Sequence, residues 1–110
     1  MEAAIKAIAE PRRREILRLV WSAELPAGQI ASHFEVTRPA ISQHLTVLKN
    51  AGLVSERREG TRRIYRARPE GLAELRSFLE GFWEESLAQL KHEAEKEERR
   101  KAHGRHAERN

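Results

Sequence analysis

The sequence predicts a mainly α-helical domain that carries one small β-hairpin. Apolar residues recur at helical spacing up to residue 50 and again after residue 69, whereas the stretch between them alternates with a period of about two. That stretch contains Gly60, and glycine is the residue that most easily turns one strand back on the next. A chain of 110 residues builds one domain with a modest core, which a partner chain would help to stabilise.

Three short helices are expected before residue 35. The first covers residues 3 to 8 and stops near Pro11, which suits the first turn of the second helix. The third opens at Leu25-Pro26 and lacks a good side-chain cap. The residues expected to face inward are Ala4, Ile5 and Ile8 in the first helix, Ile16, Leu17 and Val20 in the second, and Ile30, Ala31 and Phe34 in the third.

A fourth helix is predicted from Arg38 to the residues before Gly52, after a tight connection at residues 35 to 37. Thr37 suits its N-cap, because the hydroxyl can accept a hydrogen bond from the backbone N–H of Ala40. The apolar side consists of Ile41, Leu45 and Leu48, and the opposite side consists of Pro39, Ser42, Gln43, Thr46 and Asn50. A solvated helix face more often carries paired Glu and Lys, so this uncharged polar side is expected to touch something.

Residues 53 to 67 are predicted to form two strands joined by a loop at Glu59-Gly60. A two-residue loop there would place Glu56 opposite Arg63, Val54 opposite Tyr65, and Arg57 opposite Arg62. Like charges directly opposite each other are destabilising, and a phosphate near the loop would relieve the repulsion.

A long helix is predicted from Pro69, with an apolar stripe that exceeds what so small a domain covers alone. The stripe consists of Leu72, Leu75, Leu79, Phe82, Trp83, Leu87 and Leu90. We therefore expect a subunit interface on this helix. The highly charged residues 91–110 are expected to form a solvated helical extension or a disordered tail, separate from a domain of residues 1–90.

Charge is divided unevenly along the chain. Residues 1–68 hold 13 Lys and Arg against 7 Glu, whereas residues 69–110 hold 8 against 10. The basic part is the one expected to meet a polyanion. The chain has no Cys, no apolar run of membrane-spanning length and no export signal, so we expect a cytoplasmic protein without a membrane partner.

The order of helices, basic hairpin and long helix is that of a winged helix-turn-helix. In this fold the second helix of the motif enters the major groove of DNA, and the hairpin lies along neighbouring phosphates. Gln can pair bidentately with adenine, and Ser can serve either kind of base. The polar side of the fourth helix is therefore predicted to face base edges.

Three stretches make the sequence similar to the ArsR/SmtB family of bacterial winged-helix repressors. They read AIAEPRRREILRLV, TRPAISQHLTVLKNAGLVSERREGTRRIYRA and GLAELRSFLEGFW, and the resemblance covers residues 3 to 88. The resemblance implies a homodimer that joins through its first and last helices, binds a two-fold symmetric operator and usually represses. The implied interface residues are Ile5, Ile8, Leu72, Leu75, Leu79, Phe82, Trp83 and Leu87.

By the same resemblance, Ser42 and Gln43 match the groove-reading positions, and Thr37 and Arg38 match the start of the recognition helix near phosphate. The full set of expected DNA contacts is Thr37, Arg38, Pro39, Ser42, Gln43, His44, Thr46, Arg57, Arg58, Arg62 and Arg63, with Tyr65 as a further contact. His44 lies near the apolar arc, which favours a structural or phosphate-bonding role over base reading. For Arg12, Arg13 and Arg14 we expect pairing with Glu across the dimer rather than phosphate contact.

Metal sensing is not expected, although many members of the family release DNA on binding metal. Pro26 and Gly28 occupy the places of the thiolate ligands, and Pro69, Gly71, Phe82 and Glu85 occupy those of the histidine-carboxylate site. His92, His103 and His106 reproduce a histidine spacing about twenty residues too late, where weak adventitious binding of zinc or nickel is expected. No cofactor is expected. Two alternatives stay open for the control of DNA binding: an organic effector near Phe82 and Trp83, or no effector at all.

A protein-docking module and an enzyme are the two alternatives to DNA binding. Winged helices also serve as protein-docking surfaces, and such a module would not need its hairpin arginines for DNA. An enzyme is not expected, because the chain lacks a Gly-rich phosphate loop, the H-E-x-x-H and G-x-S-x-G motifs, and all Cys and Asp.

Overall fold

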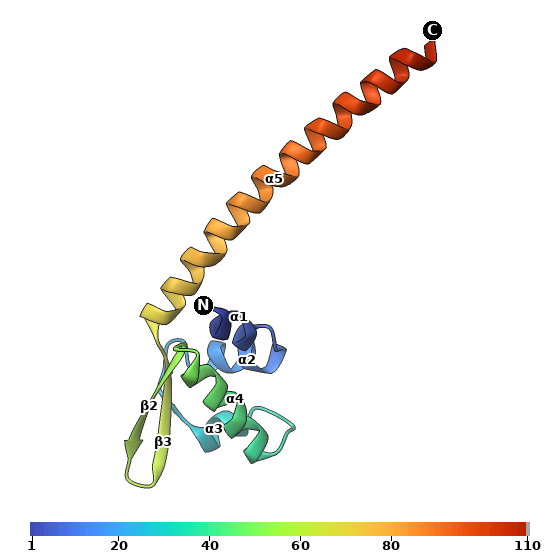
Figure 1. The fold of residues 1–110 in the computed structure, drawn as a ribbon. Helices are drawn as coiled ribbons and strands as arrows, with labels where there is room; N and C mark the ends of the chain where they lie inside the picture. Colours follow the sequence, from blue (N-terminus) through green and yellow to red (C-terminus); the bar gives the residue numbers. More distant parts are fainter. Residues whose placement is uncertain (110) are drawn as a thin grey trace. The chain divides into compact units, whose positions relative to one another are not determined.

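The computed structural model describes the backbone of residues 1–109 and the side chains of residues 1–102. It contains two compact units, Met1–Arg76 and Ser77–Asn110. The elements, in order, are α1 (Glu2–Ile8), α2 (Pro11–Leu19), β1 (Leu25–Pro26), α3 (Ala27–Ala31), α4 (Arg38–Asn50), β2 (Val54–Glu59), β3 (Arg62–Ala67) and α5 (Pro69–Arg109) (Figure 1). This confirms the mainly helical fold. Helix α5 runs through residue 90 without a break. The predicted boundary between a domain of residues 1–90 and a tail of residues 91–110 stays a prediction.

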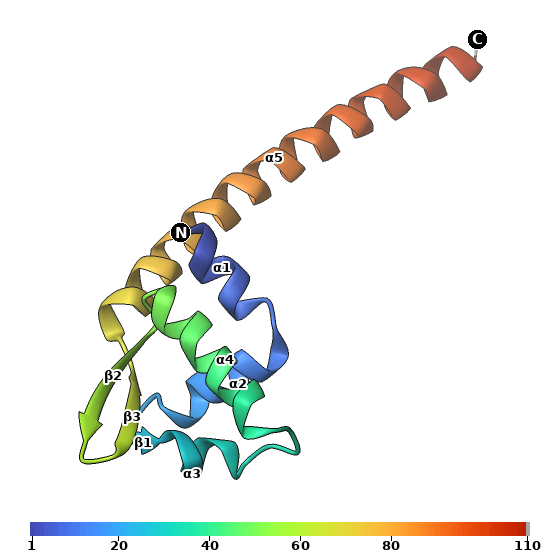
Figure 2. The ribbon, with the colours of Figure 1, turned by 60° about the horizontal axis from the view of Figure 1, so that its bottom comes forward.

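Helix α4 lies at the centre of the first unit, where it contacts α1, α2, α3 and β2 (Figure 2). Its residues Ile41, Leu45 and Leu48 are fully buried, as the apolar period predicted. The rest of the buried core comprises Ala4, Ala7, Ile16, Leu17, Val20, Ile30, Leu53, Val54, Tyr65, Ala67 and Leu75. The core thus joins every helix of this unit to the inner face of the sheet.

Side chains at the start of α2 bind the end of α1. The Glu10 carboxylate accepts a hydrogen bond from the backbone N–H of Arg13 at 3.0 Å and so caps α2. The guanidinium of Arg13 donates to the carbonyl of Ala7 at 2.6 Å, and that of Arg14 donates to the carbonyl of Ile8 at 2.7 Å. Carbonyls at a helix C-terminus attract cations. Both guanidiniums thus have partners within their own chain, and the expected pairing with Glu across a dimer stays a prediction.

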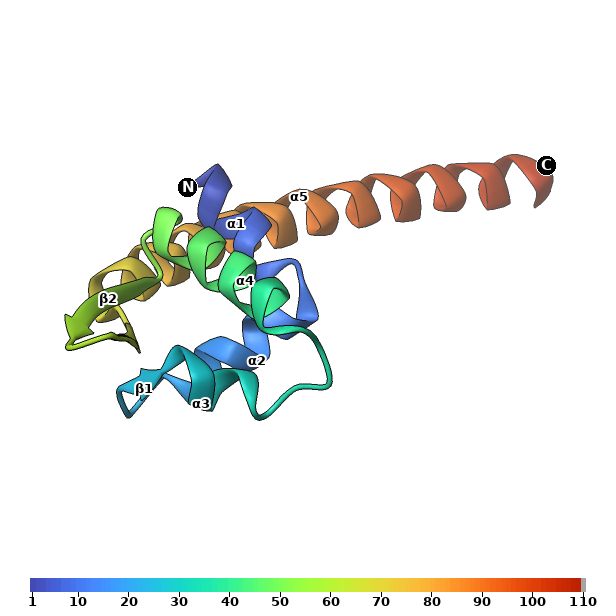
Figure 3. The same cartoon turned by 90° about the horizontal axis from the view of Figure 1, so that it is seen from below.

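The segment expected to open the third helix is a short strand. Leu25 pairs with Tyr65 and Pro26 with Ile64, which makes β1 the third strand of an antiparallel sheet ordered β1-β3-β2. Proline has no N–H to donate, and an edge strand tolerates it. Helix α3 therefore starts only at residue 27, and residues 32–37 form a longer connection to α4 than the expected residues 35–37 (Figure 3).

The hairpin is two residues out of the predicted register. Glu59 lies opposite Arg62, so the loop is Gly60-Thr61 rather than Glu59-Gly60. Gly60 has φ of +63° at the first loop position, as a type II′ turn requires. Among the described residues, only glycines have positive φ. The predicted pairs Glu56/Arg63, Val54/Tyr65 and Arg57/Arg62 are wrong, and the facing like-charged pair is Arg58 and Arg63.

Helix α4 ends as the sequence indicated, at Gly52 with φ of +77°. The N–H of Leu53 donates to the carbonyl of Leu48, and the N–H of Gly52 donates to that of Lys49, both at 3.0 Å. These are the two hydrogen bonds of a Schellman motif, which needs a left-handed residue that glycine adopts without strain. The chain therefore turns sharply from α4 into β2.

The apolar stripe of α5 is divided between burial and exposure. Leu75 is 5% exposed and belongs to the chain's own core, which corrects its assignment to a subunit interface, and Leu72 packs against that core. In the second unit the stripe is exposed over Leu79, Phe82, Trp83, Leu87 and Leu90, with Phe78 exposed beside it. Among the described residues, none of the helices combines the length and apolarity that crossing a bilayer requires.

Candidate nucleic-acid interface

The side of α4 that faces away from the core carries the predicted polar residues. Ser42, Gln43 and Thr46 are all exposed, and the Thr46 hydroxyl donates to the Ser42 carbonyl at 2.9 Å. Val47 is 39% exposed on the same face, beside Ser42 and Gln43 in a shallow hollow. Val47 is not among the residues predicted for this face, although its place one turn after Gln43 was a signal that the two side chains share it.

The start of α4 is built as expected. Thr37 caps the helix by accepting a hydrogen bond from the N–H of Ala40 at 3.3 Å, and Pro39 occupies the first turn. The Arg38 guanidinium lies close to Gly28, since a Cβ at Gly28 would be 3.2 Å from its Nη1. Glycine at position 28 thus leaves room for an arginine beside α3. The role of Gly28 could not be found from local sequence, because it depends on Arg38, ten positions further along the chain.

A cleft of about 660 Å³ lies between α3, α4 and the hairpin of β2 and β3, which we call the wing. The polar side chains that line it include Gln29, Arg38, Ser42, Thr46, Arg62 and Arg63. Arginine guanidiniums present planar donor sets that match phosphate oxygens. The cleft therefore joins the exposed polar face of α4 to cations of the wing.

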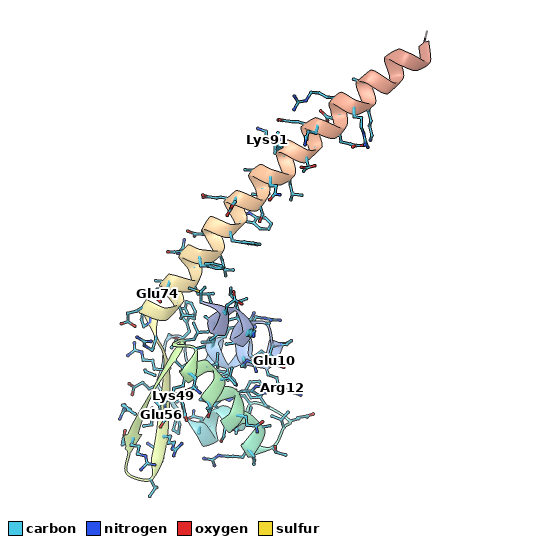
Figure 4. The ribbon with its side chains drawn as sticks, in the orientation of Figure 1. Glu10, Arg12, Lys49, Glu56, Glu74 and Lys91 are labelled. Atoms are coloured by element: carbon cyan, nitrogen blue, oxygen red, sulfur yellow. The ribbon has the colours of Figure 1, made fainter. Side chains whose placement is uncertain are left out.

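Glu56 connects α4 to the inner face of the wing. Its carboxylate accepts a hydrogen bond from the Lys49 ammonium at 3.4 Å (Figure 4). It also accepts one from the Tyr65 hydroxyl at 3.1 Å, and Arg63 lies 3.9 Å away. Burial acts to raise the pKa of Glu56, but the hydrogen bond from Tyr65 and the charge of Lys49 outweigh it, so the pKa lies below its usual range.

This carboxylate gives the fold an acid dependence. A group whose pKa is lowered by folding contributes stability above its unfolded pKa, here 4.5, and that contribution is lost as pH falls through the folded value. We expect Glu56→Gln to cost about 1 kcal/mol of unfolding free energy at neutral pH, as a typical protein hydrogen bond is worth, and less below about pH 4. Urea unfolding at both pH values measures the difference.

Glu74→Gln is the matched control, because Glu74 is exposed at the start of α5 (Figure 4). Glu10 and Glu24 also have lowered pKa values, so Glu56→Gln should reduce the acid dependence rather than abolish it. A variant that loses the same free energy at both pH values would contradict this role for Glu56.

The outer face of the wing carries two further ion pairs, both made by Arg57. Arg57 donates from Nη2 and Nε to Oε2 of Glu24, at 2.6 and 3.1 Å, and from Nη1 to Glu59 at 2.9 Å. The hydrogen bond from Arg57 holds the pKa of Glu24 below its usual range. Arg62 and Arg63 line the cleft whereas Arg57 and Arg58 do not, so the four predicted wing arginines are not equivalent.

His44 and Tyr65 are placed at the edges of the predicted site. His44 is half-buried, and its Nδ1 accepts a hydrogen bond from Arg13 at 3.3 Å, on the side of α4 that faces α2. Tyr65 lines the cleft while its hydroxyl donates to Glu56. Both positions favour a structural role, which for His44 is one of the two roles expected from sequence, and phosphate bonding by His44 stays a prediction.

The part of the chain with described side chains holds no group of three His, Cys, Asp or Glu residues arranged for a metal ion. His92 lies in this part, whereas the side chains of His103 and His106 lie outside it. Weak metal binding by these three histidines therefore stays a prediction. An organic effector near Phe82 and Trp83 likewise stays a prediction.

A helix with an exposed amide-and-hydroxyl face beside a basic hairpin defines a winged helix-turn-helix of the DNA-binding class. Residues 10–56 match the model of the family described as bacterial regulatory protein, arsR family. The HTH-type transcriptional regulator Rv2034 of Mycobacterium tuberculosis is 45% identical over 86 residues, which cover 78% of this chain and 80% of that protein. The chain belongs to the ArsR family of bacterial winged helix-turn-helix transcriptional regulators.

Two further similarities bear on assembly and regulation. The transcriptional repressor SdpR of Bacillus subtilis is 45% identical over 60 residues, covering 54% of this chain and 67% of that protein. The solution structure of a homodimeric winged helix-turn-helix DNA-binding domain from Mycobacterium bovis superposes with a TM-score of 0.62. It is 36% identical and covers 76% of this chain and 78% of that one.

Proposed function

We propose that this chain is a repressor that binds a two-fold symmetric DNA operator as a homodimer. The observation that carries the proposal is the cleft between α4 and the wing, where exposed hydroxyl groups of the helix and guanidinium groups of the hairpin line one surface. Family membership and the likeness to the repressor SdpR support it.

Base reading is assigned to the exposed face of α4. Gln43 can pair bidentately with adenine, Ser42 can donate to or accept from either kind of base, and an apolar group such as Val47 can contact a thymine methyl. The three side chains occupy adjacent positions on one exposed face. This face therefore offers both hydrogen bonding and apolar contact within a few base pairs.

Phosphate binding is assigned to the start of α4 and to the inner side of the wing. Arg38, Arg62 and Arg63 line the cleft, and Arg58 faces Arg63 across the hairpin. A phosphate between the two facing arginines would relieve their repulsion. Thr37, Pro39 and Thr46 flank this path on α4, and we assign them to the same contact with the DNA backbone.

Dimerisation is assigned to the exposed stripe of α5 with help from α1. Phe82 is 59% exposed and Trp83 is 64% exposed, an arrangement that is costly for large apolar side chains in water. The remaining interface residues we assign are Ile5, Ile8, Leu72, Leu79 and Leu87. The homodimeric relative from Mycobacterium bovis supports this assembly. Two dyad-related recognition helices would read half-sites about 34 Å apart.

The test is to select duplexes from a random-sequence pool and titrate the best one beside an unrelated duplex. We expect a two-fold symmetric motif, one dimer per duplex by light scattering, and affinity for the selected duplex at least about 1000-fold above that for unrelated DNA at physiological salt. Affinity should fall steeply with salt, because each neutralised phosphate releases counterions. Equal affinity for both duplexes would refute sequence-specific binding.

The protein-interaction alternative makes an opposite prediction for the wing. If the wing were only a docking surface, Arg62→Ala with Arg63→Ala would leave DNA affinity unchanged. Transcription in vitro from a promoter that overlaps the selected operator separates repression from activation, because a repressor lowers the transcript yield as protein is added.

A further inference from the structure

The outer face of the sheet buries one isoleucine outside the main core. Ile64 is 5% exposed, yet it is not part of the contiguous cluster of core residues. It lies on the middle strand β3, with Arg57 of β2 directly opposite on one side and Pro26 of β1 directly opposite on the other. Something on this face must therefore cover Ile64.

Arg57 is placed to provide that cover. Its guanidinium reaches Glu24, the residue just before β1, while its backbone lies in β2. An ion pair between these two positions crosses the middle strand, and the apolar stem of an arginine can cover an apolar side chain beneath it. The interaction therefore connects the two edge strands above Ile64.

The charge of Arg57 is already shared by two carboxylates. Glu24 and Glu59 both accept hydrogen bonds from it, and their effect raises the pKa of Arg57 further. By contrast, no hydrogen bond or ion pair to Arg58 is found among the described residues, and Arg63 approaches Glu56 only at 3.9 Å. A phosphate would have to compete with two glutamates at Arg57 but not at Arg58.

We infer that Arg57 is a positioning residue rather than a contact to DNA phosphate. Its ion pair with Glu24, which we call the strap, holds the wing against the segment before β1. This inference rests on the proposed function, because the wing must be held at a fixed angle to α4 for Arg58, Arg62 and Arg63 to meet the DNA backbone. A two-stranded hairpin is only marginally stable alone, and β1 contributes just two residues to the sheet. The strap adds a side-chain connection where the backbone ladder is short.

The expected effect is local, because the ion pair is exposed and such pairs contribute little to global stability. Reversing one charge with Arg57→Glu places three glutamates together and should open the strap. Backbone amides of β2 and β3 are then expected to exchange hydrogen at least about tenfold faster in the free protein, as local opening becomes easier. The midpoint of global unfolding should change little.

The decisive variant exchanges the two charges, with Glu24→Arg and Arg57→Glu in one chain. It keeps the net charge and restores an ion pair across Ile64, but it places a negative charge at position 57. If Arg57 is a strap, hydrogen exchange returns to the wild-type rate, and affinity for the selected duplex returns to within about threefold of wild type, as a coupled pair requires. If Arg57 contacts phosphate, the exchanged variant binds no better than Arg57→Glu alone.

The salt dependence of binding supplies the second readout. Arg58→Gln should reduce the slope of log affinity against log salt by about 0.9, because one phosphate contact is lost, whereas the exchanged variant, which keeps the ion pair but has no cation at position 57, should leave the slope unchanged. Equal reductions in both variants would overturn the inference. Should the wild-type chain fail to discriminate between duplexes, the proposed function falls, and hydrogen exchange in the free protein still tests the strap.

Discussion

Replacing both Ser42 and Gln43 with Ala is expected to remove most of the preference for the selected duplex while binding to unrelated DNA persists. Both side chains are exposed on α4, and neither donates a hydrogen bond from its side chain within the part of the chain described. A good bidentate contact to a base is worth about 1–3 kcal/mol of discrimination. The loss per contact is then about 5- to 150-fold in the ratio of the two dissociation constants.

Titration of the double variant on both duplexes at one salt concentration measures that ratio. The matched control is Ser77→Ala with Gln89→Ala, which changes the same residue types at exposed positions of α5. The control should keep the wild-type ratio. If the double variant also keeps it, base reading does not depend on this face, and the assignment of α4 as the recognition helix is wrong.

Replacing Gly71 with Ala is expected to be the most destabilising of the conservative changes considered. A Cβ at Gly71 would collide with the carbonyl oxygen and carbon of Gly52, both of which are backbone atoms that cannot rotate away. Gly52 is itself fixed by the turn that ends α4. Forcing an extra methyl group into such a contact costs about 1–3 kcal/mol or more. The midpoint of thermal unfolding should fall by about 10 °C in a domain of this size.

Gly81→Ala offers a matched control on the same helix. A Cβ at Gly81 meets nothing within 4 Å, so alanine should improve the helix by about 0.5–1 kcal/mol and raise the midpoint. The two variants must be compared at equal protein concentration, because dimerisation couples stability to concentration. A Gly71→Ala midpoint equal to or above that of the wild type would show that the start of α5 does not pack on Gly52.

Helix α4 could be predicted from sequence because its determinants are local. The cap at Thr37, the apolar period of Ile41, Leu45 and Leu48, and the stop at Gly52 each act within a few residues. The polar face follows from the same period, so Ser42 and Gln43 were found before the structure. Val47 was missed because apolar residues of a helix are expected to face the core. Its exposure depends on how wide the buried side of α4 is, and the sequence does not give that width.

The sheet could not be predicted in the same way. Strand β1 forms because β3 offers it backbone partners, and β3 lies about forty residues further along the chain. The register was assigned from Glu59-Gly60, but a glycine with positive φ at the first loop position moves the turn by one residue and shifts each facing pair by two. A small difference in turn chemistry thus changed which arginines face each other.

The sequence alone determined the order of the helices, the exposed polar face of α4 and the basic character of the hairpin, since periodicity, capping and composition act over short distances. The tertiary structure decided which cations already have partners within the chain. Arg13 and Arg14 bind the end of α1, and Arg57 binds Glu24, which lies 33 residues away in the chain. Charge counts along a sequence cannot reveal such pairs, because an ion pair depends on which residues the fold brings within a few ångströms of each other.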